Sequence, residues 1–360
     1  MKTGIITFHF VNNYGGALQA YALRRYMADT FGVDAELIDY RNWFIRTTDA
    51  IRMLPVTANY RIYGPWLRAY PRMRRRRRLF AAFMKNRISR SRRYDFGWQL
   101  NGHGKDYDLL ICGSDQIWNP TLTFGLAKPY FLRFAGPESR RVSYAASPGP
   151  SIRDKDKMLA YVRDLDAVSI RESAEWLEQG LGKPVEHHID PTLLLPTEAW
   201  RSMAKAPAEK GEYIVSYFMQ QNDKAYGYLE QIRRETGLPV RDISRYGYKP
   251  AGVDESLVDV GPEDFVGLFA SATRVCTNSF HGLVFALIFN KPVDFVPMHR
   301  FGGRIEYLCK LLNLKRVPVD GGAYYHIEYD PAEKGRILEG ERRRAHDYLE
   351  RQVGLAGGGN

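Results

Sequence analysis

The sequence has few cysteines and no long apolar run. Its 360 residues include three cysteines, Cys112, Cys276 and Cys309, and this odd, widely spaced set fits neither a disulfide framework nor a zinc site. The longest clean apolar run, residues 283–289, is far shorter than the roughly 20 residues that span a bilayer. Residues 1–10 read as a β-strand and not as a signal peptide. These absences predict a cytoplasmic protein that does not cross the membrane.

Motifs for common cofactors and catalytic metals are also absent. The sequence contains no HExxH, no CxxC and no carboxylate triad at metal-ligand spacing. It has neither a GxGxxG pattern after its first strand nor a Walker motif. We therefore expect no metal site and no required cofactor.

Acidic residues are scarce in one segment. The chain carries a net charge of +11, but residues 41–100 alone hold fifteen arginines, one lysine and two acidic residues, a net charge of +14. Aromatic residues lie among the arginines, a mixture that suits an interface between water and anionic lipid. A solvated helix face is an equally good interpretation. A nucleic-acid patch is a weaker one, because no nucleic-acid motif accompanies the charge, and we expect no nucleic-acid partner.

Short β-rich runs alternate with helical patterns in two series. This rhythm is typical of parallel α/β sheets, and a chain of 360 residues favours two domains over one. We predict the α/β class, with two doubly wound Rossmann-like domains that face each other across a cleft. The predicted parts are an N-terminal domain (1–188) with a basic aromatic insertion (41–100), a C-terminal domain (189–330), a C-terminal helix (331–353) and a disordered tail (354–360).

Polar residues just after predicted strands are the candidate site residues, because doubly wound sheets bind ligands at the carboxyl ends of their strands. The first group stands between a strand and a helix. Paired glycines there let backbone N–H groups approach a ligand, and a plain tight turn is the alternative. The group consists of Asn13, Tyr14, Gly15, Gly16 and Gln19.

A second group follows the strand predicted within residues 107–112. Ser114, Asp115 and Gln116 offer a hydroxyl, a carboxylate and an amide, and Trp118 comes close behind. A helix cap would explain Ser114 or Asp115 alone but not the whole group, so we favour a binding site. Ser147 follows the next strand as a candidate contact, although close packing is the more natural role for its small neighbours.

Arg171 also ends a predicted strand, where it could clamp a carboxylate or phosphate, or pair with Glu172 or Glu175. In the second series, three polar residues precede an apolar helix, and a histidine there can carry protons near neutral pH. These residues are Asn278, Ser279 and His281. Arg300 and Arg304 form a further candidate anion clamp, with ordinary surface arginines as the alternative.

Six stretches, in their order and spacing, resemble the polysaccharide pyruvyltransferase family over about residues 3–315. They are "NYGGALQAYAL", "DLLICGSDQIWNP", "YAAS", "SIRE", "DPTLLL" and "NSFHGLVFALIFNKP". The resemblance implies a fold similar to that of GT-B glycosyltransferases. It also implies an enzyme that transfers pyruvate from phosphoenolpyruvate onto two hydroxyls of a sugar, which forms a cyclic ketal and releases phosphate.

Several members of that family carry Arg-Leu-His where this chain has Ser279, Phe280 and His281. The resemblance implies that His281 acts as acid or base, whereas the arginine that holds the donor in those members is replaced here by serine. We expect the C-terminal domain to bind the donor. The expected donor-binding residues are Arg171, Asn278, Ser279, Arg300 and Arg304.

The N-terminal domain is then expected to bind the acceptor, a sugar in a surface glycan or a lipid-linked precursor, with Asp115 as a second catalytic residue. The basic segment 41–100 could hold the protein at the inner face of the membrane. A glycosyltransferase that uses a nucleotide sugar and a non-catalytic glycan-binding protein are the alternatives. The expected acceptor-binding residues are Asn13, Tyr14, Gly15, Gly16, Gln19, Ser114, Gln116, Trp118 and Ser147.

Overall fold

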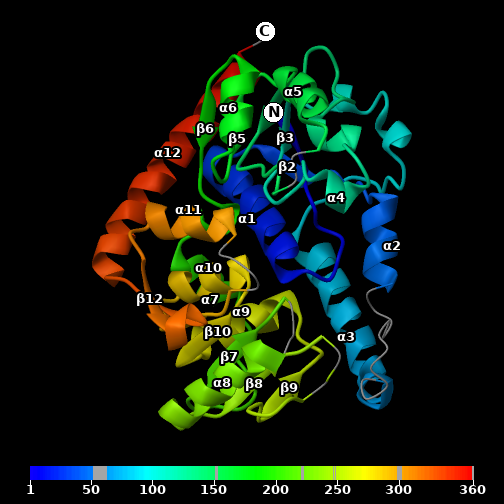
Figure 1. Ribbon diagram of the computed structural model, residues 1–360. Helices are drawn as coiled ribbons and strands as arrows, with labels where there is room; N and C mark the ends of the chain where they lie inside the picture. The colour runs from blue at the N-terminus through cyan, green and yellow to red at the C-terminus, as the bar shows by residue number, and fades with distance from the viewer. Residues whose placement is uncertain are drawn as a thin grey trace. The chain divides into compact units, whose positions relative to one another are not determined.

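A computed structural model describes residues 1–51, 63–150, 153–219, 223–245, 247, 249–297 and 302–358 (Figure 1). The chain divides into two compact units. Unit 1 comprises Met1–Met53, Met84–Leu195 and Glu339–Asn360, and unit 2 comprises Leu54–Phe83 and Pro196–Leu338.

Unit 1 is built on a parallel sheet. Its four central strands are ordered β2-β1-β3-β4, with β1 (Lys2–Ile6), β2 (Asp34–Leu37), β3 (Leu109–Cys112) and β4 (Arg140–Ser143). A parallel pair, β5 (Val168–Ile170) and β6 (Val185–His187), continues this sheet through isolated bridges near β4. Every residue of β3 is buried, as expected for a parallel strand covered on both faces.

Helices of unit 1 follow the strands. α1 begins after Asn13, whose side chain accepts a hydrogen bond from Gly16 N, and ends at Gly32, which has a φ of 63°. Glycine is favoured there because the conformation is left-handed. The helices are α1 (Tyr14–Phe31), α2 (Trp43–Ile51), α4 (Pro120–Thr123), α5 (Lys155–Arg163), α6 (Glu175–Leu181), and the 3-10 turns η2 (Gly97–Leu100), η3 (Gly104–Asp106), η4 (Lys128–Phe131) and η5 (Pro191–Leu193).

Unit 2 has a mixed sheet of order β12-β13-β11-β10-β7-β8-β9. Among the strands described, β13 runs antiparallel to both of its neighbours, β11 and β12, and the other pairs are parallel. The strands are β7 (Ile214–Tyr217), β8 (Val240–Ile243), β9 (Glu255–Leu257), β10 (Arg274–Thr277), β11 (Val293–Phe295), β12 (Lys315–Val319) and β13 (Tyr324–Glu328).

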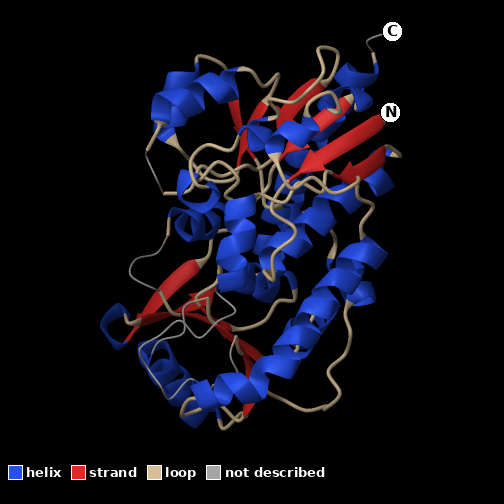
Figure 2. Cartoon of the chain, turned by 90° about the vertical axis from the view of Figure 1, so that its right-hand side faces the viewer, coloured by secondary structure: helices blue, strands red, loops and turns tan. Residues whose placement is uncertain are grey.

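The helices of unit 2 include one that is buried on all sides. α10 (Phe280–Ile288) is buried at every position, as expected for a helix in the middle of a core. The others are α7 (Thr197–Met203), α8 (Asp223–Thr236), α9 (Pro262–Ser271), α11 (Gly303–Leu311) and the 3-10 turn η6 (Asp320–Gly322). Strands with helices packed around them appear in both units (Figure 2), so the predicted α/β class with two Rossmann-like units is confirmed.

The arginine run lies on α3 (Tyr63–Arg87), and its first part belongs to unit 2. The buried positions Ala69, Met73, Arg76, Phe80 and Phe83 recur at helical spacing and form one face. Arg76 Nη1 on that face donates to Ser244 O at 3.2 Å. Arg72 and Arg75 both pair with Asp259, at 3.0 and 3.1 Å. The run is therefore partly structural, because one of its faces packs on the unit 2 sheet.

The last helix, α12 (Pro331–Gly357), ends in unit 1. Tyr348 Oη donates to Ser143 O at 2.7 Å. Arg342 donates to Leu193 O and Leu195 O at 2.7 and 3.0 Å. These contacts tie the end of the chain to β4 and to the turn that closes the first pass through unit 1.

The observed division corrects the predicted domain boundaries in three places. Unit 1 extends to Leu195 and not to residue 188, residues 54–83 of the basic insertion belong to unit 2, and the end of α12 returns to unit 1. α12 also continues to Gly357, so residues 354–357 are helical and not a disordered tail, while 359–360 lie outside the described residues. Packing causes each difference, since the apolar faces of α3 and α12 select their partners.

Three further observations bear on the sequence predictions. Cys112, Cys276 and Cys309 are buried and free, so the prediction that they form no disulfide framework is confirmed. Within the described ranges, no helix is long and apolar enough to cross a membrane. The same part of the chain holds no group of three or more His, Cys, Asp or Glu side chains that could bind a metal ion.

Candidate functional site

In each unit the strand order reverses at one point, and the candidate residues lie beside it. In unit 1 the chain passes from β1 to β2 on one side and then to β3 on the other side of β1. Ligands of doubly wound sheets bind at such a switch point, beyond the carboxyl ends of the two strands. The loop after β1 carries Asn13, the first turn of α1 carries Gly16, and the loop after β3 carries Ser114, Asp115 and Gln116. Two of the predicted motifs therefore meet at the unit 1 switch point.

The turn after β3 approaches the end of β4 closely. A Cβ atom added at Gly113 would lie 2.1 Å from Tyr144 O, so only glycine fits there. Asp115 has a φ of 69° and Ala145 a φ of 47°. Residues other than glycine seldom adopt this left-handed conformation, and such strained positions gather at functional sites. The glycine of the "GSD" sequence thus sets the position of Asp115.

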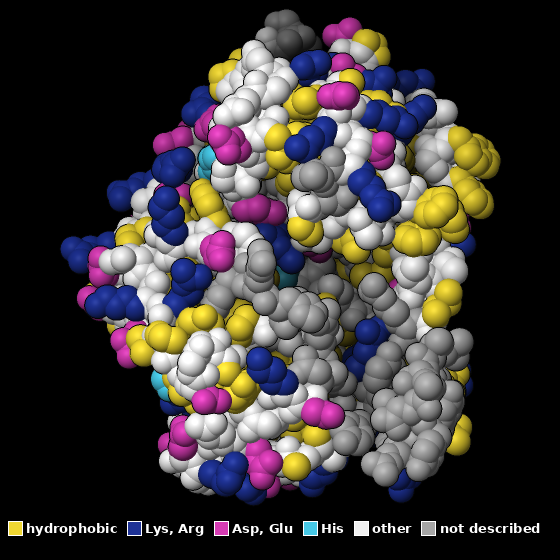
Figure 3. All heavy atoms as spheres, viewed as in Figure 1, with side chains coloured by type: hydrophobic (Ala, Val, Ile, Leu, Met, Phe, Trp, Pro, Cys, Tyr) yellow, Lys and Arg dark blue, Asp and Glu magenta, His cyan; other side chains and the backbone are white. Residues whose placement is uncertain are grey.

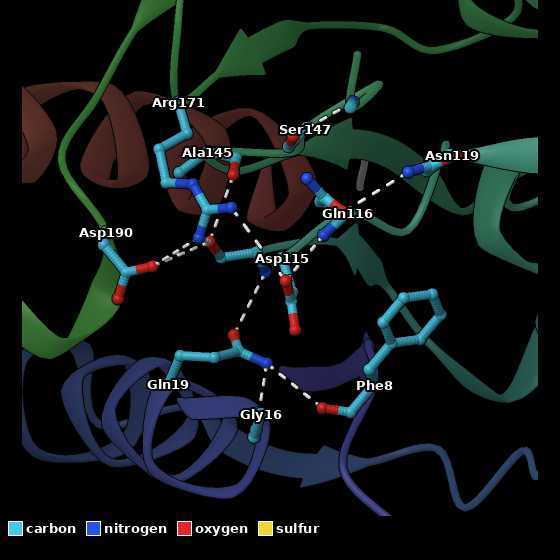
Figure 4. Close-up of polar contacts among 12 residues, drawn as sticks. Phe8, Gly16, Gln19, Asp115, Gln116, Asn119, Ala145, Ser147, Arg171 and Asp190 are labelled. Carbon is cyan, nitrogen blue, oxygen red and sulfur yellow. Dashed lines mark hydrogen bonds and ion pairs between the residues drawn. The ribbon is translucent and has the colours of Figure 1, made fainter. Parts of the chain in front are cut away.

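Gln19 joins the two loops (Figure 4). Its Nε2 donates to Thr7 Oγ1, Phe8 O and Gly16 O at 2.9, 3.2 and 3.1 Å. Its Oε1 accepts a hydrogen bond from Ser114 N at 3.3 Å. The side chain has no exposed surface, so it does not reach a ligand in this conformation. Gln19 has a positioning role in place of the predicted acceptor contact.

Arg171, at the end of β5, lies among three carboxylates. Two of them, Asp115 and Asp190, are labelled in Figure 4. Its Nη1 donates to Asp190 Oδ2 at 2.7 Å, and its Nε to Glu172 Oε2 at 3.4 Å. Its Nη2 lies 3.9 Å from Asp115 Oδ1. Although burial opposes its charge, the carboxylates of Glu172, Asp190 and Asp115 raise the pKa of Arg171 above its ordinary value. The guanidinium therefore stays charged and holds the ends of β3 and β5 and the turn at Asp190 together.

This arrangement corrects the prediction that Arg171 clamps the donor. The side chain is only 3% exposed, and three carboxylates around one guanidinium leave a formal charge of −2. A carboxylate and a phosphate on the same ligand would be repelled by that excess. Of the three acids, Asp115 is the most exposed, at 15% against 11% for Glu172 and 0% for Asp190. Asp115 is thus the carboxylate of this cluster best placed to meet a ligand.

Three predicted acceptor contacts turn out to be internal. Ser114 Oγ donates to Ala145 O at 3.1 Å, and Ser147 Oγ forms a hydrogen bond with Glu172 Oε1. Trp118 Nε1 donates to a backbone carbonyl at 3.0 Å. None of these three side chains has exposed surface. Ser114 and Ser147 support the carboxylate cluster, and Trp118 is a core residue, which the sequence could not distinguish from an aromatic ligand platform.

The end of the loop after β1 and the first turn of α1 border the same cluster. Asn13 caps α1 by accepting a hydrogen bond from Gly16 N at 3.2 Å. Tyr14, Gly15 and Gly16 are buried. A Cβ atom on Gly16 would lie 3.9 Å from Asp115 Oδ2, so this backbone passes beside the carboxylate. Asn13 and Gln116 keep intermediate exposure, and with Asp115 they are the predicted unit 1 residues that a ligand can reach.

Unit 2 has its own switch point, between β7 and β10. Asn278 follows β10, and its Oδ1 accepts a hydrogen bond from Met219 N, after β7, at 2.7 Å. Ser279 caps α10 by accepting a hydrogen bond from Gly282 N at 3.4 Å. Both side chains are nearly buried. Asn278 and Ser279 therefore fix the two loops of the switch point, which is a structural use of residues that were predicted to bind the donor.

His281 lies in the first turn of α10, beside this switch point. A Cβ atom on Gly282 would lie 2.2 Å from Thr277 Oγ1, so the glycine of "SFHG" is needed for the helix to start so close to β10. His281 is 8% exposed, and its ring stands edge-on to Phe280 with the ring centroids 5.1 Å apart. The imidazole is thus held firmly at the positive end of a buried helix.

An arginine lies near the same residues. The guanidinium of Arg304, on α11, is 5.7 Å from the centroid of the Phe280 ring. This places a cation beside the residue that precedes His281. Arg300, predicted as its partner, lies outside the described residues.

A family model for polysaccharide pyruvyl transferases matches residues 13–296, well over half of the chain. This chain belongs to the polysaccharide pyruvyl transferase family. The matched range contains the Asp115 cluster and His281 and ends before Arg304. The predicted resemblance is confirmed.

Solved structures align with most of this pyruvyl transferase family member at low identity. S. aureus MnaA in a UDP co-structure is 12% identical, with 94% of this chain and 87% of that chain covered and a TM-score of 0.49. UDP-GlcNAc 2-epimerase from Neisseria meningitidis, bound to UDP-GlcNAc, is 11% identical, with 99% of this chain and 94% of that chain covered and a TM-score of 0.45. E. coli heptosyltransferase WaaC with ADP is 15% identical, with 81% of this chain and 86% of that chain covered and a TM-score of 0.37. No curated relative matches the chain, so family membership rests on the family model.

Two parts of the site were not predicted as such from the pyruvyl transferase sequence. Asp190 was quoted within "DPTLLL" without a role, yet its Oδ1 accepts hydrogen bonds from Thr192 and its Oδ2 holds Arg171. A lone aspartate before a proline, close after a strand, was the available signal.

The other missed group is a buried pair after β1 and β2. His9 Nε2 lies 3.1 Å from Asp39 Oδ1, and Arg41 donates to both Asp39 oxygens at 2.8 and 2.9 Å. Although burial opposes ionisation, the hydrogen bonds from His9 and Arg41 hold the pKa of Asp39 well below its ordinary value. The ion pair between Arg41 and Asp39, together with the hydrogen bond to His9, fixes the segment between β2 and α2.

Proposed function

We propose that this protein transfers pyruvate from phosphoenolpyruvate onto two hydroxyls of one sugar, in a surface glycan or a lipid-linked precursor, and releases phosphate. The observation that carries the proposal is His281, a histidine at the positive end of a buried helix beside the unit 2 switch point, in a chain of this family. Histidine transfers protons in both directions near neutral pH, and pyruvyl transfer needs both directions.

We assign the donor to unit 2. Phosphoenolpyruvate carries a carboxylate and a phosphate, which need cationic partners or backbone N–H groups. Arg304 supplies a cation beside Phe280, and the first turn of α10 supplies the positive end of a helix dipole. The Asp115 cluster of unit 1 has the opposite charge and suits a different ligand.

We assign the acceptor to unit 1. A sugar presents hydroxyl groups, and an ionised carboxylate accepts hydrogen bonds from them. Asp115 and Glu172 keep some exposed surface, while Arg171 and Asp190 hold them in place. Asp115 is therefore the group that would orient an acceptor hydroxyl and accept its proton.

The reaction balances with two protons. His281, in its protonated form, gives a proton to the methylene carbon of phosphoenolpyruvate, which becomes a methyl group and leaves positive charge at C2. One sugar hydroxyl adds to C2 and loses its proton, phosphate leaves with a proton, and the second hydroxyl closes the ketal and loses its own. Two hydroxyl protons are released, one to Asp115 and one to His281. Two are consumed, one from His281 by carbon and one from Asp115 by phosphate, so both residues return to their starting states.

Phosphate release from phosphoenolpyruvate, measured with a panel of galactosyl, mannosyl and glucosyl acceptors, tests the proposal. We expect release only with particular acceptors. His281→Gln should lower kcat by about 10²–10⁴-fold, the usual contribution of a general acid or base. Arg304→Gln should raise the KM for phosphoenolpyruvate more than it lowers kcat.

Matched controls are available in the chain. His187→Gln changes a half-buried histidine that pairs with Glu178, and Arg233→Gln changes an exposed arginine that pairs with Asp254. Both variants should keep wild-type rates. Unchanged turnover of His281→Gln would remove His281 from the mechanism. Nucleotide release from a nucleotide sugar, without phosphate release from phosphoenolpyruvate, would replace the proposal with glycosyl transfer.

We also propose that an anionic membrane surface is a partner, through exposed arginines of α3 that lie outside the face packed on the unit 2 sheet. Arg74, Arg77 and Arg78 are exposed, whereas Arg72 and Arg75 pair with Asp259. Lysine and arginine near an anionic leaflet each contribute about 1 kcal/mol of attraction. A lipid-linked acceptor would then be met at the surface that carries it.

A further inference from the structure

A cavity of about 410 Å³ lies in unit 1, outside the Asp115 cluster. Its size falls within the range of small-ligand sites. One wall is an aromatic ring, and the others offer a hydroxyl, a guanidinium and a carboxylate. The lining residues are Pro120, Thr121, Phe124, Gly125, Arg153 and Asp154.

Phe124 is displayed at this cavity. It follows α4 with a φ of 57°, a left-handed conformation in which glycine or asparagine would be less strained. Its side chain is 70% exposed, so the ring gains little from burial. The sequence has a large aromatic group where the backbone conformation does not favour one, and strained positions of this kind gather at ligand sites.

Two more rings extend the aromatic wall. Phe124 lies 5.2 Å from Phe44 and 5.6 Å from Trp43, measured between ring centroids. Trp43 is itself 45% exposed. Figure 3 shows hydrophobic side chains gathered over α2 and α4, where these rings lie. Three adjoining rings provide a platform on which the C–H faces of sugar rings can pack.

The cavity is joined to the Asp115 cluster by a short, hydrogen-bonded stretch of chain. Asn119 Oδ1 accepts a hydrogen bond from Thr121 N at 3.0 Å, and Asn119 Nδ2 donates to Gln116 Oε1 at 3.3 Å. The contact between Asn119 and Gln116 is drawn in Figure 4. Thr121, in the cavity wall, is therefore linked through one side chain to the residue after Asp115.

We propose that this cavity binds a neutral sugar unit of the acceptor glycan, next to the sugar that is pyruvylated. The inference rests on the proposed function. Arg153 and Asp154 give the wall no net charge, which suits an uncharged sugar better than a phosphate or an anionic lipid headgroup. The aromatic platform packs on the sugar ring, and Thr121, Arg153 and Asp154 bind its hydroxyls.

Calorimetric titration of the full chain with neutral galacto-, manno- and gluco-oligosaccharides of increasing length, without phosphoenolpyruvate, tests this inference. The longer members of one series should bind more tightly than their monosaccharide. Phe124→Ala should raise the Kd of the longer members roughly 5- to 10-fold, the loss of one aromatic contact, and leave the monosaccharide Kd unchanged. Arg153→Gln should act in the same direction.

Trp98→Ala is the matched control, because Trp98 is 69% exposed and does not line the cavity. It should change no Kd. Wild-type Kd values for both Phe124→Ala and Arg153→Gln, in every series, would overturn the inference. So would a loss of binding to phosphatidylglycerol vesicles with unchanged oligosaccharide binding, since the patch would then be a lipid contact. Phe124-dependent binding without any phosphate release would refute the proposed pyruvyl transfer and leave the sugar site standing.

Discussion

Asp242, on β8, is a buried acid that forms no ion pair with a cationic side chain in the described part of the chain. Its Oδ1 accepts a hydrogen bond from Ser216 Oγ at 2.6 Å and its Oδ2 one from Tyr226 Oη at 3.2 Å. Burial raises its pKa to about 6, although the two hydrogen bonds act in the other direction. In the unfolded chain an aspartate titrates near 3.9. The folded state therefore binds a proton that the unfolded state releases between these two values.

The sign of the effect follows from this order. A pKa that is higher in the folded state gives stability that is fully present below about pH 4 and is lost as the pH rises through 6. A difference of about 2 units corresponds to about 3 kcal/mol of unfolding free energy at 1.36 kcal/mol per unit. Asp242→Asn removes the titration and keeps groups that can bond to Ser216 and Tyr226. The unfolding free energy of this variant should exceed that of the wild type by about 1.5 kcal/mol at pH 5 and by about 3 kcal/mol at pH 8.

The assay is urea unfolding at pH 5 and pH 8. Unfolding of unit 2 is monitored by pulsed hydrogen exchange of the peptide that contains β8. Any pH dependence that the two proteins share cancels in the difference between them. Asp223→Asn, at an exposed position in the first turn of α8, should shift stability equally at both pH values. If the difference between Asp242→Asn and wild type is the same at pH 5 and pH 8, the assignment of a buried, proton-binding Asp242 is refuted.

Three further predictions concern other parts of the molecule. Asp190→Ala should destabilise unit 1 by about 3–5 kcal/mol, because it leaves Arg171 buried beside fewer carboxylates; thermal unfolding that matches wild type would contradict this. Burial and nearby arginines lower the pKa of His188 to about 3. The unfolding free energy of the wild type should therefore fall by up to about 5 kcal/mol as the pH falls from 6.5 to 3. In the same acid titration, the unfolding free energy of His188→Gln should fall by less. Arg77→Glu with Arg78→Glu should weaken sedimentation with phosphatidylserine vesicles about 30-fold or more at low salt and leave phosphatidylcholine vesicles unaffected; equal sedimentation of variant and wild type would exclude α3 as the lipid contact.

The sequence predicted the strands and the loops that follow them, because alternation of apolar runs and glycine-rich turns is a local property. That is why Asp115 was placed correctly just after a strand, and His281 at the start of an apolar helix. The sequence did not predict which polar groups turn inward. From the sequence alone, Gln19 and Trp118 resemble ligand contacts, but in the fold both side chains are buried among other protein atoms.

Pairing across long sequence distances was also invisible. Arg171 finds its main partner, Asp190, only when the segment after β6 passes the end of β5. The assignment of α3 to unit 2 depends on a buried face that includes Arg76, a residue that composition alone places in water. In both cases a charge is buried because its partner is supplied by the tertiary fold.

Unit 1 is built from segments at both ends of the chain, so its parts are synthesised at different times. The ribosome delivers everything up to Leu195, then all of Pro196–Leu338, and only then the helix turns that carry Arg342 and Tyr348. Those two side chains bond to the carbonyls of Leu193 and Ser143. During translation, unit 1 therefore stays incomplete, with part of its surface uncovered, until the segment Pro196–Leu338 of unit 2 has been synthesised. A stalled or truncated chain would thus present a finished second unit beside an unfinished first one, the form that a chaperone or protease would meet.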